Sequence, residues 1–330
     1  MTNLTAKELK IFNNLSRVQS PSVSLGNKIQ EIIGAIHGTS GSPVNAVAAQ
    51  ATLNVGGVVT HGETLGINNP LKAGEDSYVF MADEAQEPVV STDIPVDISA
   101  YTTASTINLT VDTQPTAGDK MVIGTKEYTF TAIGANDADG KISVEVDLDG
   151  AQAAIVGAIN GTDGVNTPNA FAKASAFDAG TDICAITALV GGVAGNAIAT
   201  TEEFDAGTNV FAANKLAGGA DCSAANAITA LVSAITASDT QGVGAIDGDG
   251  NTVVLTADVA GVDGNDIVVG VVMANGTFAN AATKLAGGIN GTVGTAGEIH
   301  RDSSYVYIAI DDNAITDANW RRIEVGEAYY

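Results

Sequence analysis

Histidine is the side chain best suited to acid–base catalysis and metal binding near neutral pH. This chain of 330 residues holds three histidines: His37, His61 and His300. His37 ends an expected helix, where its charge suits the helix dipole, His61 stands beside a glycine in an expected turn, and His300 lies in a charged strand. Because none of them belongs to a recognisable catalytic constellation, we expect all three to be polar surface residues.

Two cysteines, Cys184 and Cys222, are the residues most open to covalent or redox chemistry, and they stand at no metal-ligand spacing. We expect free thiols in small apolar sites. A disulfide between them stays open, because both lie near the boundary of a domain that internal repeats indicate. The sequence also lacks a nucleophile elbow, a phosphate loop and a dinucleotide fingerprint. It therefore predicts no catalytic residue, no cofactor and no metal ligand.

Acidic residues could bind a cation or hydrolyse a glycan, but the sequence argues against both. Residues 247–251 read Asp-Gly-Asp-Gly-Asn, like the start of a calcium loop, but Thr252 stands where glycine is needed and a strand pattern follows. We expect a polar turn there, and another at residues 137–140. A depolymerase would need paired carboxylates in a groove, whereas the acids here are scattered through turns. We therefore expect a protein that is not an enzyme.

Composition excludes several classes of partner. The chain has 14 Lys and Arg against 38 Asp and Glu, a formal charge of −24, so we expect no nucleic-acid partner. The sequence has no stretch of 18 apolar residues and its start has no apolar signal region, so we expect no membrane partner and a soluble chain made in a cytoplasm. The 38 glycines and the low aromatic fraction of 5% suit short strands and tight turns.

The strongest pattern in the sequence is a repeat whose halves are out of order. Residues 195–198 and 215–219 match residues 264–267 and 284–288 at a constant offset of 69. Earlier in the chain, Leu-Asn-Val and Gly-Glu at 53–55 and 62–63 match Leu-Thr-Val and Gly-Asp at an offset of 56, and Tyr-Val-Phe at 78–80 resembles Tyr-Thr-Phe at 128–130. The order is first half, first half, second half, second half, so we infer that one domain is inserted into a loop of its sibling.

This arrangement predicts an α+β fold of four parts. They are an N-terminal helical arm and linker at 1–45, a split α+β domain at 46–100 plus 222–289, an inserted α+β domain at 104–219, and a C-terminal β element at 290–330. We expect the junctions at 100–105 and 219–223 to lie close together. Apolar periodicity predicts helices at 151–160 and 224–236, and strands at 51–55, 106–111, 142–146, 183–188, 252–257 and 305–310, with another strand beginning at Trp320.

The N-terminal part contains an unusually apolar helical stripe. Ser24 can cap a helix that places five side chains at steps of three and four, and a Gly/Ser tract at 38–43 follows with linker composition. The stripe could pack on the chain's own domain, but we favour contact with other copies or with a partner surface. The candidate anchoring or oligomerisation residues are Leu25, Ile29, Ile32, Ile33 and Ile36.

The repeat resembles a module of tailed-bacteriophage virion proteins, above all capsid decoration and head-fibre proteins. The resemblance rests on Gly118-Asp119, Tyr128-Thr129-Phe130, 195–198 and 216–219, on closing stretches at 294–297, 302–309 and 320–323, and on the start of the arm at 25–38. It implies a structural protein on the outer capsid surface of the virion, synthesised in the host cytoplasm. Our hypothesis from the apolar stripe is that the N-terminal arm attaches to the major capsid protein or trimerises. The resemblance also implies a homotrimer and no catalytic residues.

A second function from another class stays open at this point. A tail fibre or adhesin that binds a host surface receptor would carry exposed aromatic residues on its distal domain. Tyr101, Tyr329 and Tyr330 are the candidates.

Overall fold

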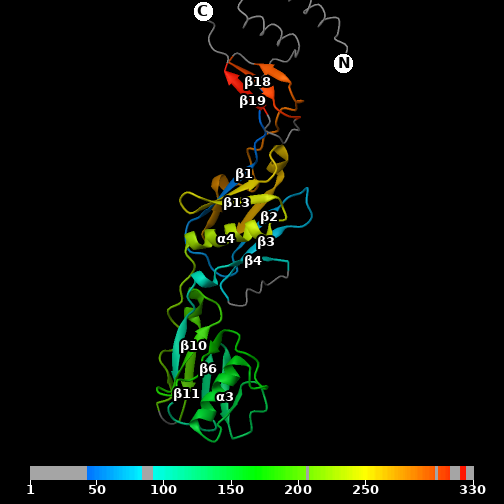
Figure 1. Cartoon of the computed structure of the whole chain (residues 1–330). Coiled ribbons are helices and arrows are strands. Elements are labelled where there is room, and N and C mark those ends of the chain that lie inside the picture. The colour runs from blue at the N-terminus through cyan, green and yellow to red at the C-terminus, as the bar shows by residue number, and fades with distance from the viewer. Residues whose placement is uncertain (1–42, 84–91, 206–207, 302–303, 313–319, 325–330) are drawn as a thin grey trace, which may run out of the picture. The chain divides into compact units, whose positions relative to one another are not determined.

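The structure is a computed structural model that describes residues 43–83, 92–205, 208–301, 304–312 and 320–324 (Figure 1). The described residues form five β-sheets and two α-helices, so the fold class is α+β or mostly β. The segment for which N-terminal helices are expected lies outside the described residues, with the stripe residues Leu25, Ile29, Ile32, Ile33 and Ile36, and so do His37, Tyr329 and Tyr330.

The chain divides into two compact units. Unit 1 comprises Met1–Ala51, Leu255–Val268 and Lys284–Tyr330, and unit 2 comprises Thr52–Val254 and Val269–Thr283. These bounds fall inside three strands and differ from the four parts that the repeat predicts, so the four-part division stays a prediction. In the described part of the chain, no helix is both long enough and apolar enough to cross a membrane.

The inserted segment contains two four-stranded sheets and helix α3 (Leu148–Asn160). The sheet orders are β12-β5-β10-β9 and β11-β6-β7-β8. The helix packs Ile155 and Ile159 into a core with side chains from both sheets. The strands are β5 (Thr106–Thr110), β6 (Lys120–Ile123), β7 (Lys126–Thr131), β8 (Lys141–Ser143), β9 (Ala172–Ala174), β10 (Ile183–Ala188), β11 (Thr200–Glu203) and β12 (Val210–Phe211).

Segments 46–100 and 222–289 contribute strands to the same two sheets, ordered β13-β14-β1-β16 and β15-β2-β3-β4. Leu53, for example, pairs with Phe278. Helix α4 (Ala224–Ser238) buries Ile228, Leu231 and Ile235, as its periodicity predicts. The strands are β1 (Gln50–Val55), β2 (Thr64–Asn68), β3 (Asp76–Met81), β4 (Ile94–Asp97), β13 (Val243–Gly248), β14 (Thr252–Ala257), β15 (Val268–Val272) and β16 (Gly276–Phe278).

The third region is a small antiparallel sheet of β17 (Ile299–Arg301), β18 (Tyr305–Ala309) and β19 (Trp320–Glu324), in that order. It confirms the strand expected from 305 and the strand expected to begin at Trp320. One strand prediction was wrong in length, because 142–146 ends as a strand at Ser143. Glu145 has a φ of 52°, a left-handed conformation that cannot continue a strand.

One turn, Thr-x-Gly-acid, recurs in all three regions. In the inserted segment the Asp119 carboxylate accepts a hydrogen bond from the Thr116 amide at 2.8 Å, and Gly118 has a φ of +109°. The Gly118 amide donates to the Phe130 carbonyl at 2.9 Å, and the Phe130 amide donates back to Asp119 at 2.8 Å. The turn therefore fixes the register of the β6–β7 hairpin.

The same bonds occur at residues 60–63, where Glu63 accepts from the Thr60 amide at 3.1 Å. They occur a third time in the C-terminal sheet, where Glu298 accepts from Thr295 at 3.0 Å and the Gly297 amide donates to Ala309 at 2.8 Å. The sequence comparison related only the first two turns. The C-terminal sheet thus begins with the same local structure as each repeat.

An isolated β-bridge joins the two ends of each repeat. Thr103 and Ala220 exchange two backbone hydrogen bonds of 2.9 and 3.0 Å, which confirms that the two junctions lie close together. Val47 and Ile289 exchange the equivalent bonds, also of 2.9 and 3.0 Å, at the ends of the other repeat.

An asparagine locks each of these junctions. Asn196 accepts from the Gly219 amide at 2.9 Å and donates to the Gly219 carbonyl at 3.2 Å. Asn265 does the same with Gly288, at 2.8 and 3.0 Å. A Cβ added at Gly219 would lie 2.2 Å from the Gly192 carbonyl oxygen, so no other residue fits this backbone approach.

The inserted copy has a short loop at the position that corresponds to the insertion point in the split copy. In the split copy the chain runs through β3 and β4, leaves for the inserted segment, and returns to begin α4. In the inserted copy β7 and β8 lead directly into α3 through residues 144–147. Val146 in this short loop is 77% exposed. The loop therefore occupies the place that holds a whole domain in the sibling.

We expect a ten-residue Gly/Ser segment inserted between Glu145 and Val146 to lower the free energy of unfolding by only about 1 kcal/mol, the cost of a longer loop. The Gln114 side chain keeps its bonds to the carbonyls of Val144 and Glu145, and Asp147 still caps α3. Urea unfolding followed by circular dichroism measures the effect.

The matched control carries the same segment between Gly118 and Asp119, where it breaks three hydrogen bonds of the turn. We expect this control to lose about 3 kcal/mol more than the Glu145–Val146 variant. Equal losses for the two insertions would contradict the equivalence of the loop and the insertion point.

Candidate functional site

The described residues contain no group of three or more histidine, cysteine or acidic side chains that could hold a metal ion. Three other features could carry function: a shallow depression on one sheet, a polar network beside it, and buried ionisable side chains. The depression and the network lie in the inserted segment, and the ionisable side chains with little exposure occur in both repeats and, as His300, in the C-terminal sheet.

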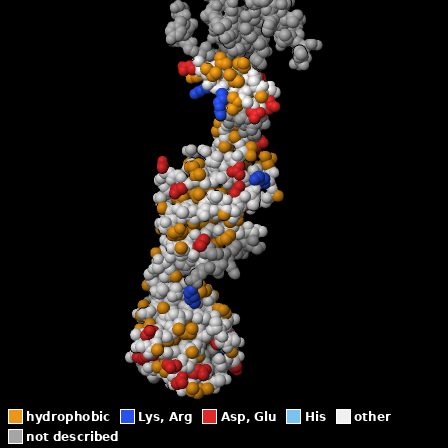
Figure 2. All heavy atoms as spheres, in the orientation of Figure 1, with side chains coloured by type: hydrophobic (Ala, Val, Ile, Leu, Met, Phe, Trp, Pro, Cys, Tyr) orange, Lys and Arg blue, Asp and Glu red, His pale blue; other side chains and the backbone are white. Residues whose placement is uncertain are grey.

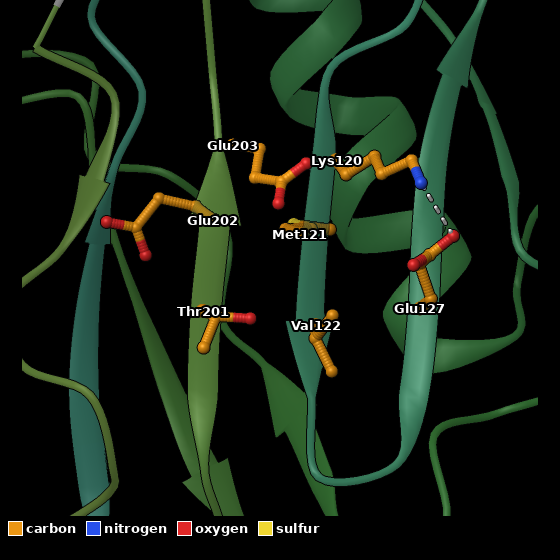
Figure 3. A pocket seen from close by; sticks show the side chains of 7 residues that line it. All are labelled: Lys120, Met121, Val122, Glu127, Thr201, Glu202 and Glu203. Carbon is orange, nitrogen blue, oxygen red and sulfur yellow. Dashed lines mark ion pairs between the residues drawn. The ribbon is translucent and has the colours of Figure 1, made fainter.

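The depression lies on the outer part of the sheet formed by β11, β6 and β7 (Figure 3). Strand pairing places Lys120 opposite Glu203, and Val122 opposite both Thr201 and Glu127. Cross-strand partners share a face of an antiparallel sheet. The full lining is Lys120, Met121, Val122, Glu127, Thr201, Glu202 and Glu203.

One ion pair dominates the chemistry of this depression. The Lys120 ammonium lies 3.5 Å from a Glu127 carboxylate oxygen, and the two side chains are 41% and 54% exposed. A pair so exposed contributes at most about 1 kcal/mol. The lining includes no histidine, cysteine or serine that could act as a nucleophile or a base near neutral pH. The depression can therefore accept a small polar or cationic group, but its lining does not assemble a reaction centre.

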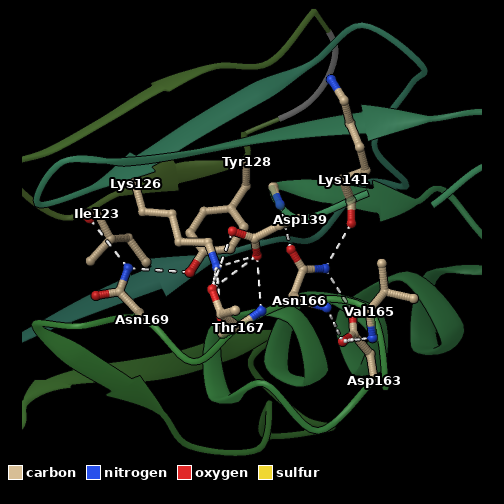
Figure 4. A network of polar contacts seen from close by, with 11 residues as sticks. Ile123, Lys126, Tyr128, Asp139, Lys141, Asp163, Val165, Asn166, Thr167 and Asn169 are labelled. Atoms are coloured by element: carbon tan, nitrogen blue, oxygen red, sulfur yellow. Dashed lines mark hydrogen bonds and ion pairs between the residues drawn. The ribbon is translucent and has the colours of Figure 1, made fainter. Parts of the chain in front are cut away.

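A polar network fastens the loop after α3 to the β7 hairpin (Figure 4). The Lys126 ammonium donates to Asp139 at 2.8 Å and to the Thr167 carbonyl at 2.5 Å, and the Thr167 amide donates to the same Asp139 oxygen at 2.8 Å. The hydrogen bond from Lys126 is the main reason that the pKa of Asp139 lies below its usual value. Lys126 is therefore a structural cross-link.

Asn166 holds the other side of the same loop. Its side chain accepts from the Gly140 amide at 2.6 Å and donates to Lys141 and Asp163 at 2.9 and 2.7 Å. Burial works to raise the pKa of Asp163, but the hydrogen bonds from Asn166 and nearby amides outweigh it and lower that pKa. The donors and acceptors of this network bond to one another. The network therefore holds the loop after α3 in place.

The histidines differ from the expectation of surface polar residues. The His300 side chain is only 11% exposed, its Nε2 lies 2.8 Å from a Glu298 oxygen, and its ring packs edge-on against Trp320 at 4.8 Å. The prediction was wrong for His300, because the C-terminal sheet packs this face. His61 is half-buried, and its Nδ1 accepts from the Ala82 amide at 3.1 Å. Both rings support backbone or packing.

Both acidic stretches are turns, as predicted. Residues 249–251 connect β13 to β14, with Gly250 and Asn251 in left-handed conformations at φ of 69° and 60°. Residues 137–140 form the turn that presents Asp139 to Lys126.

Both cysteines are free and buried, which confirms the prediction of free thiols. Burial raises the pKa of Cys184 to about 12 and that of Cys222 to about 11. Because the thiolate is the nucleophile, neither thiol is activated for catalysis.

Comparisons with known proteins add no relative. No family model matches the chain, and no curated protein and no solved structure is similar enough to match.

The repeat matched Asn196 with Asn265 but gave them no role, and the sequence pattern did not single out the third Thr-x-Gly-acid turn or the low exposure of His300. The tetrapeptide Thr-Ala-Gly-Glu at 295–298 was a usable signal, because it differs from residues 116–119 only in the length of the acid.

We expect neither thiol to react with Ellman's reagent at pH 8 in the native chain, and two thiols per chain to react in 6 M guanidinium chloride. The raised pKa values of Cys184 and Cys222 and their burial protect both in the folded state. Rapid reaction without denaturant would contradict the burial, and an absence of thiols in denaturant would indicate a disulfide.

We expect stability to fall in alkali partly through Tyr128, which is fully buried. Burial raises its pKa to about 12, so its stabilising effect is complete below pH 10 and is lost as the pH rises toward 12. Between pH 9 and 11 this group alone removes about 1 kcal/mol. Urea unfolding should show that loss in wild type and a shallower pH dependence in Tyr128→Phe.

Tyr101→Phe is the matched control, because Tyr101 is 43% exposed. Its pH dependence should equal that of wild type. If Tyr128→Phe also keeps the wild-type slope, the buried phenol is not the group that titrates.

Proposed function

We propose that this chain is a non-enzymatic capsid decoration or head-fibre protein of a tailed bacteriophage. It sits on the outer capsid surface as a homotrimer and binds the major capsid protein through its N-terminal arm, residues 1–45. Its candidate anchoring residues are Leu25, Ile29, Ile32, Ile33 and Ile36.

The distribution of charge carries this proposal. Residues 43–289 hold 29 acidic and seven basic side chains, whereas residues 1–42 hold two acidic and four basic ones. Figure 2 shows acidic side chains scattered over the described surface, with few lysines and arginines among them. The acidic repeats repel one another and other particles, while the arm lacks that repulsion and is free to bind a surface.

The described interior supports a passive role. The buried aromatic and sulfur side chains of the repeats serve packing, and the polar networks fasten loops. Domains that are held together by their own cores are suited to the role of a projecting spacer.

A tail fibre or adhesin that binds a host receptor is the second candidate. Exposed apolar side chains on the inserted segment favour it, since Val146 is 77% and Ile133 59% exposed. Electron microscopy of virions with the labelled protein separates the two functions. Label on the head supports decoration, and label on the tail overturns it in favour of the adhesin.

We expect Ile32→Asp to abolish loading onto virions, because a carboxylate in the centre of the stripe cannot enter an apolar contact. The β domains should stay folded, with unchanged circular dichroism and melting temperature. Particle-bound protein is measured by immunoblot of purified virions.

Leu71→Asp is the control, because Leu71 is 72% exposed and lies in the acidic repeats. It should load as wild type does. Normal loading of Ile32→Asp would refute anchoring through the stripe.

A further inference from the structure

Three asparagines of this chain are followed directly by glycine. They are Asn160, Asn275 and Asn290, and threonine follows the glycine in each case. Glycine has no side chain to shield its amide nitrogen, so this nitrogen can attack the asparagine carboxamide and close a five-membered succinimide ring. Because the three sites share the same local sequence, differences in their reactivity come from how the fold holds each carboxamide.

The carboxamide of Asn160 is held at both of its atoms. Asn160 ends helix α3, its Nδ2 donates to the Ala174 carbonyl at 2.9 Å, and its Oδ1 accepts from the Ala174 amide at 2.8 Å. A Cβ added at the following Gly161 would lie 2.5 Å from Pro168, so the backbone there is crowded. The carboxamide therefore cannot turn toward the Gly161 nitrogen without losing two hydrogen bonds.

The carboxamide of Asn275 is held at its nitrogen, the atom that must leave. Its Nδ2 donates to the Val58 carbonyl at 2.9 Å, and its backbone carbonyl accepts from the Gly56 amide at 2.8 Å. A Cβ added at Gly57 would lie 2.9 Å from Cγ of Asn275, so this side chain packs closely against the backbone. Closure of the ring requires the Asn275 side chain to give up its bond to Val58.

The carboxamide of Asn290 is held at its oxygen instead. Its Oδ1 accepts from the Val262 amide at 2.9 Å, and no hydrogen bond within the described residues involves its Nδ2. An N–H that donates to the carboxamide oxygen stabilises the negative charge that forms on this oxygen when a nucleophile adds to Cγ, as in an oxyanion hole. The fold thus activates the carbonyl of Asn290 and leaves its nitrogen able to depart.

The inserted copy has an aspartate at the equivalent position. Asp221 and Val193 precede Asn290 and Val262 by the repeat offset of 69, and the Asp221 Oδ1 accepts from the Val193 amide at 2.8 Å. A carboxylate therefore fits this turn and makes the same hydrogen bond. Conversion of Asn290 to aspartate preserves the local structure.

We propose that Asn290 is a site of spontaneous deamidation, with water as the only co-reactant. The Gly291 nitrogen bonds to Cγ of Asn290, the bond from Cγ to Nδ2 breaks, and the proton of the Gly291 amide leaves with ammonia. Water then opens the succinimide. Addition at the side-chain carbonyl gives aspartate, and addition at the main-chain carbonyl gives isoaspartate. This modification is independent of the proposed function.

The isoaspartate product alters the connection to the C-terminal sheet. Its main chain runs through the former side chain and is longer by a methylene group shortly before Thr292. The Thr292 amide donates to the Val44 carbonyl at 2.9 Å, and its carbonyl accepts from the Trp320 indole at 2.8 Å. The longer main chain displaces these two bonds, whereas the aspartate product leaves them in place.

The experiment follows all three sites by mass spectrometry in the full-length chain, kept at pH 8 and 37 °C. Trypsin cuts after Lys173 and Lys284, so the three asparagines fall on separate peptides. We expect Asn290 to deamidate about fivefold faster than Asn275, the ratio that about 1 kcal/mol from one hydrogen bond gives, and Asn160 to be the slowest. In 6 M guanidinium chloride the three rates should become similar, because the fold no longer distinguishes the sites.

Val262→Pro tests the activating N–H directly, because proline lacks it. Val262 is the first residue of the 3₁₀ turn η3 (Val262–Asp266), a position that suits proline, and it is 45% exposed. The matched control is Val193→Pro, at the first residue of η2 (Val193–Ala197) in the inserted copy. We expect Val262→Pro to slow deamidation of Asn290 about fivefold and Val193→Pro to leave it unchanged, with both variants folded by circular dichroism.

Three outcomes overturn the proposal. The first is an Asn290 that reacts no faster than Asn275 in the folded chain. The second is the same ratio of rates in the folded and the unfolded chain, which would assign the difference to sequence alone. The third is a folded Val262→Pro chain in which Asn290 reacts as fast as in wild type, or faster.

Discussion

The close approach of two backbones at the ends of each repeat is the constraint on which the rest of the structure depends. Gly219 runs so near the Gly192 carbonyl that a side chain cannot fit, and the equivalent contact exists between Gly288 and Gly261. An isolated β-bridge and an asparagine side chain then hold the two ends together. A domain whose two ends leave at one point can be placed in a loop without distorting its host.

This constraint explains how the halves of the repeat can stand out of order in the sequence and still form complete sheets. The whole inserted segment separates the first half of the split copy from its partner strands in the sequence. Leu53 nevertheless pairs with Phe278. Strand pairing over such a separation carries a large cost in chain entropy. The inserted segment reduces it, because its own junction at Thr103 and Ala220 brings the distant halves together.

The interior of the repeats is devoted to packing. Tyr78 and Tyr128 occupy equivalent buried positions but satisfy their hydroxyl groups differently, through Asp76 in one copy and Asn169 in the other. Both copies have a bulky tyrosine ring at this position, whereas the hydrogen-bond partner of its hydroxyl differs. The ring therefore contributes mainly to core packing. The two cysteines also contribute to packing, because their burial makes them poor nucleophiles.

The spacing of apolar residues alone determined the secondary structure of elements that bury one face against a core. The period of apolar residues in 224–236 and the alternation in 183–188 were sufficient to predict α4 and β10, because burial on one face leaves that trace in any sequence. The repeat offsets likewise indicated that the junctions lie close together. Composition and charge indicated a chain poorly suited to bind nucleic acid.

Only the tertiary structure decided features that depend on distant partners. The predicted strand at 142–146 stops early because Glu145 adopts a left-handed conformation in the loop before α3. The His300 side chain is only 11% exposed because Trp320, twenty residues later, packs against its ring. The Thr-x-Gly-acid turn appears a third time because its hydrogen bonds, and not its length of matching sequence, define it. The contact between His300 and Trp320 joins residues whose sequence separation hides it, and the backbone conformation of Glu145 leaves no apolar period to read. The third turn did leave a sequence signal, Thr-Ala-Gly-Glu at 295–298, but its hydrogen bonds were needed to identify it.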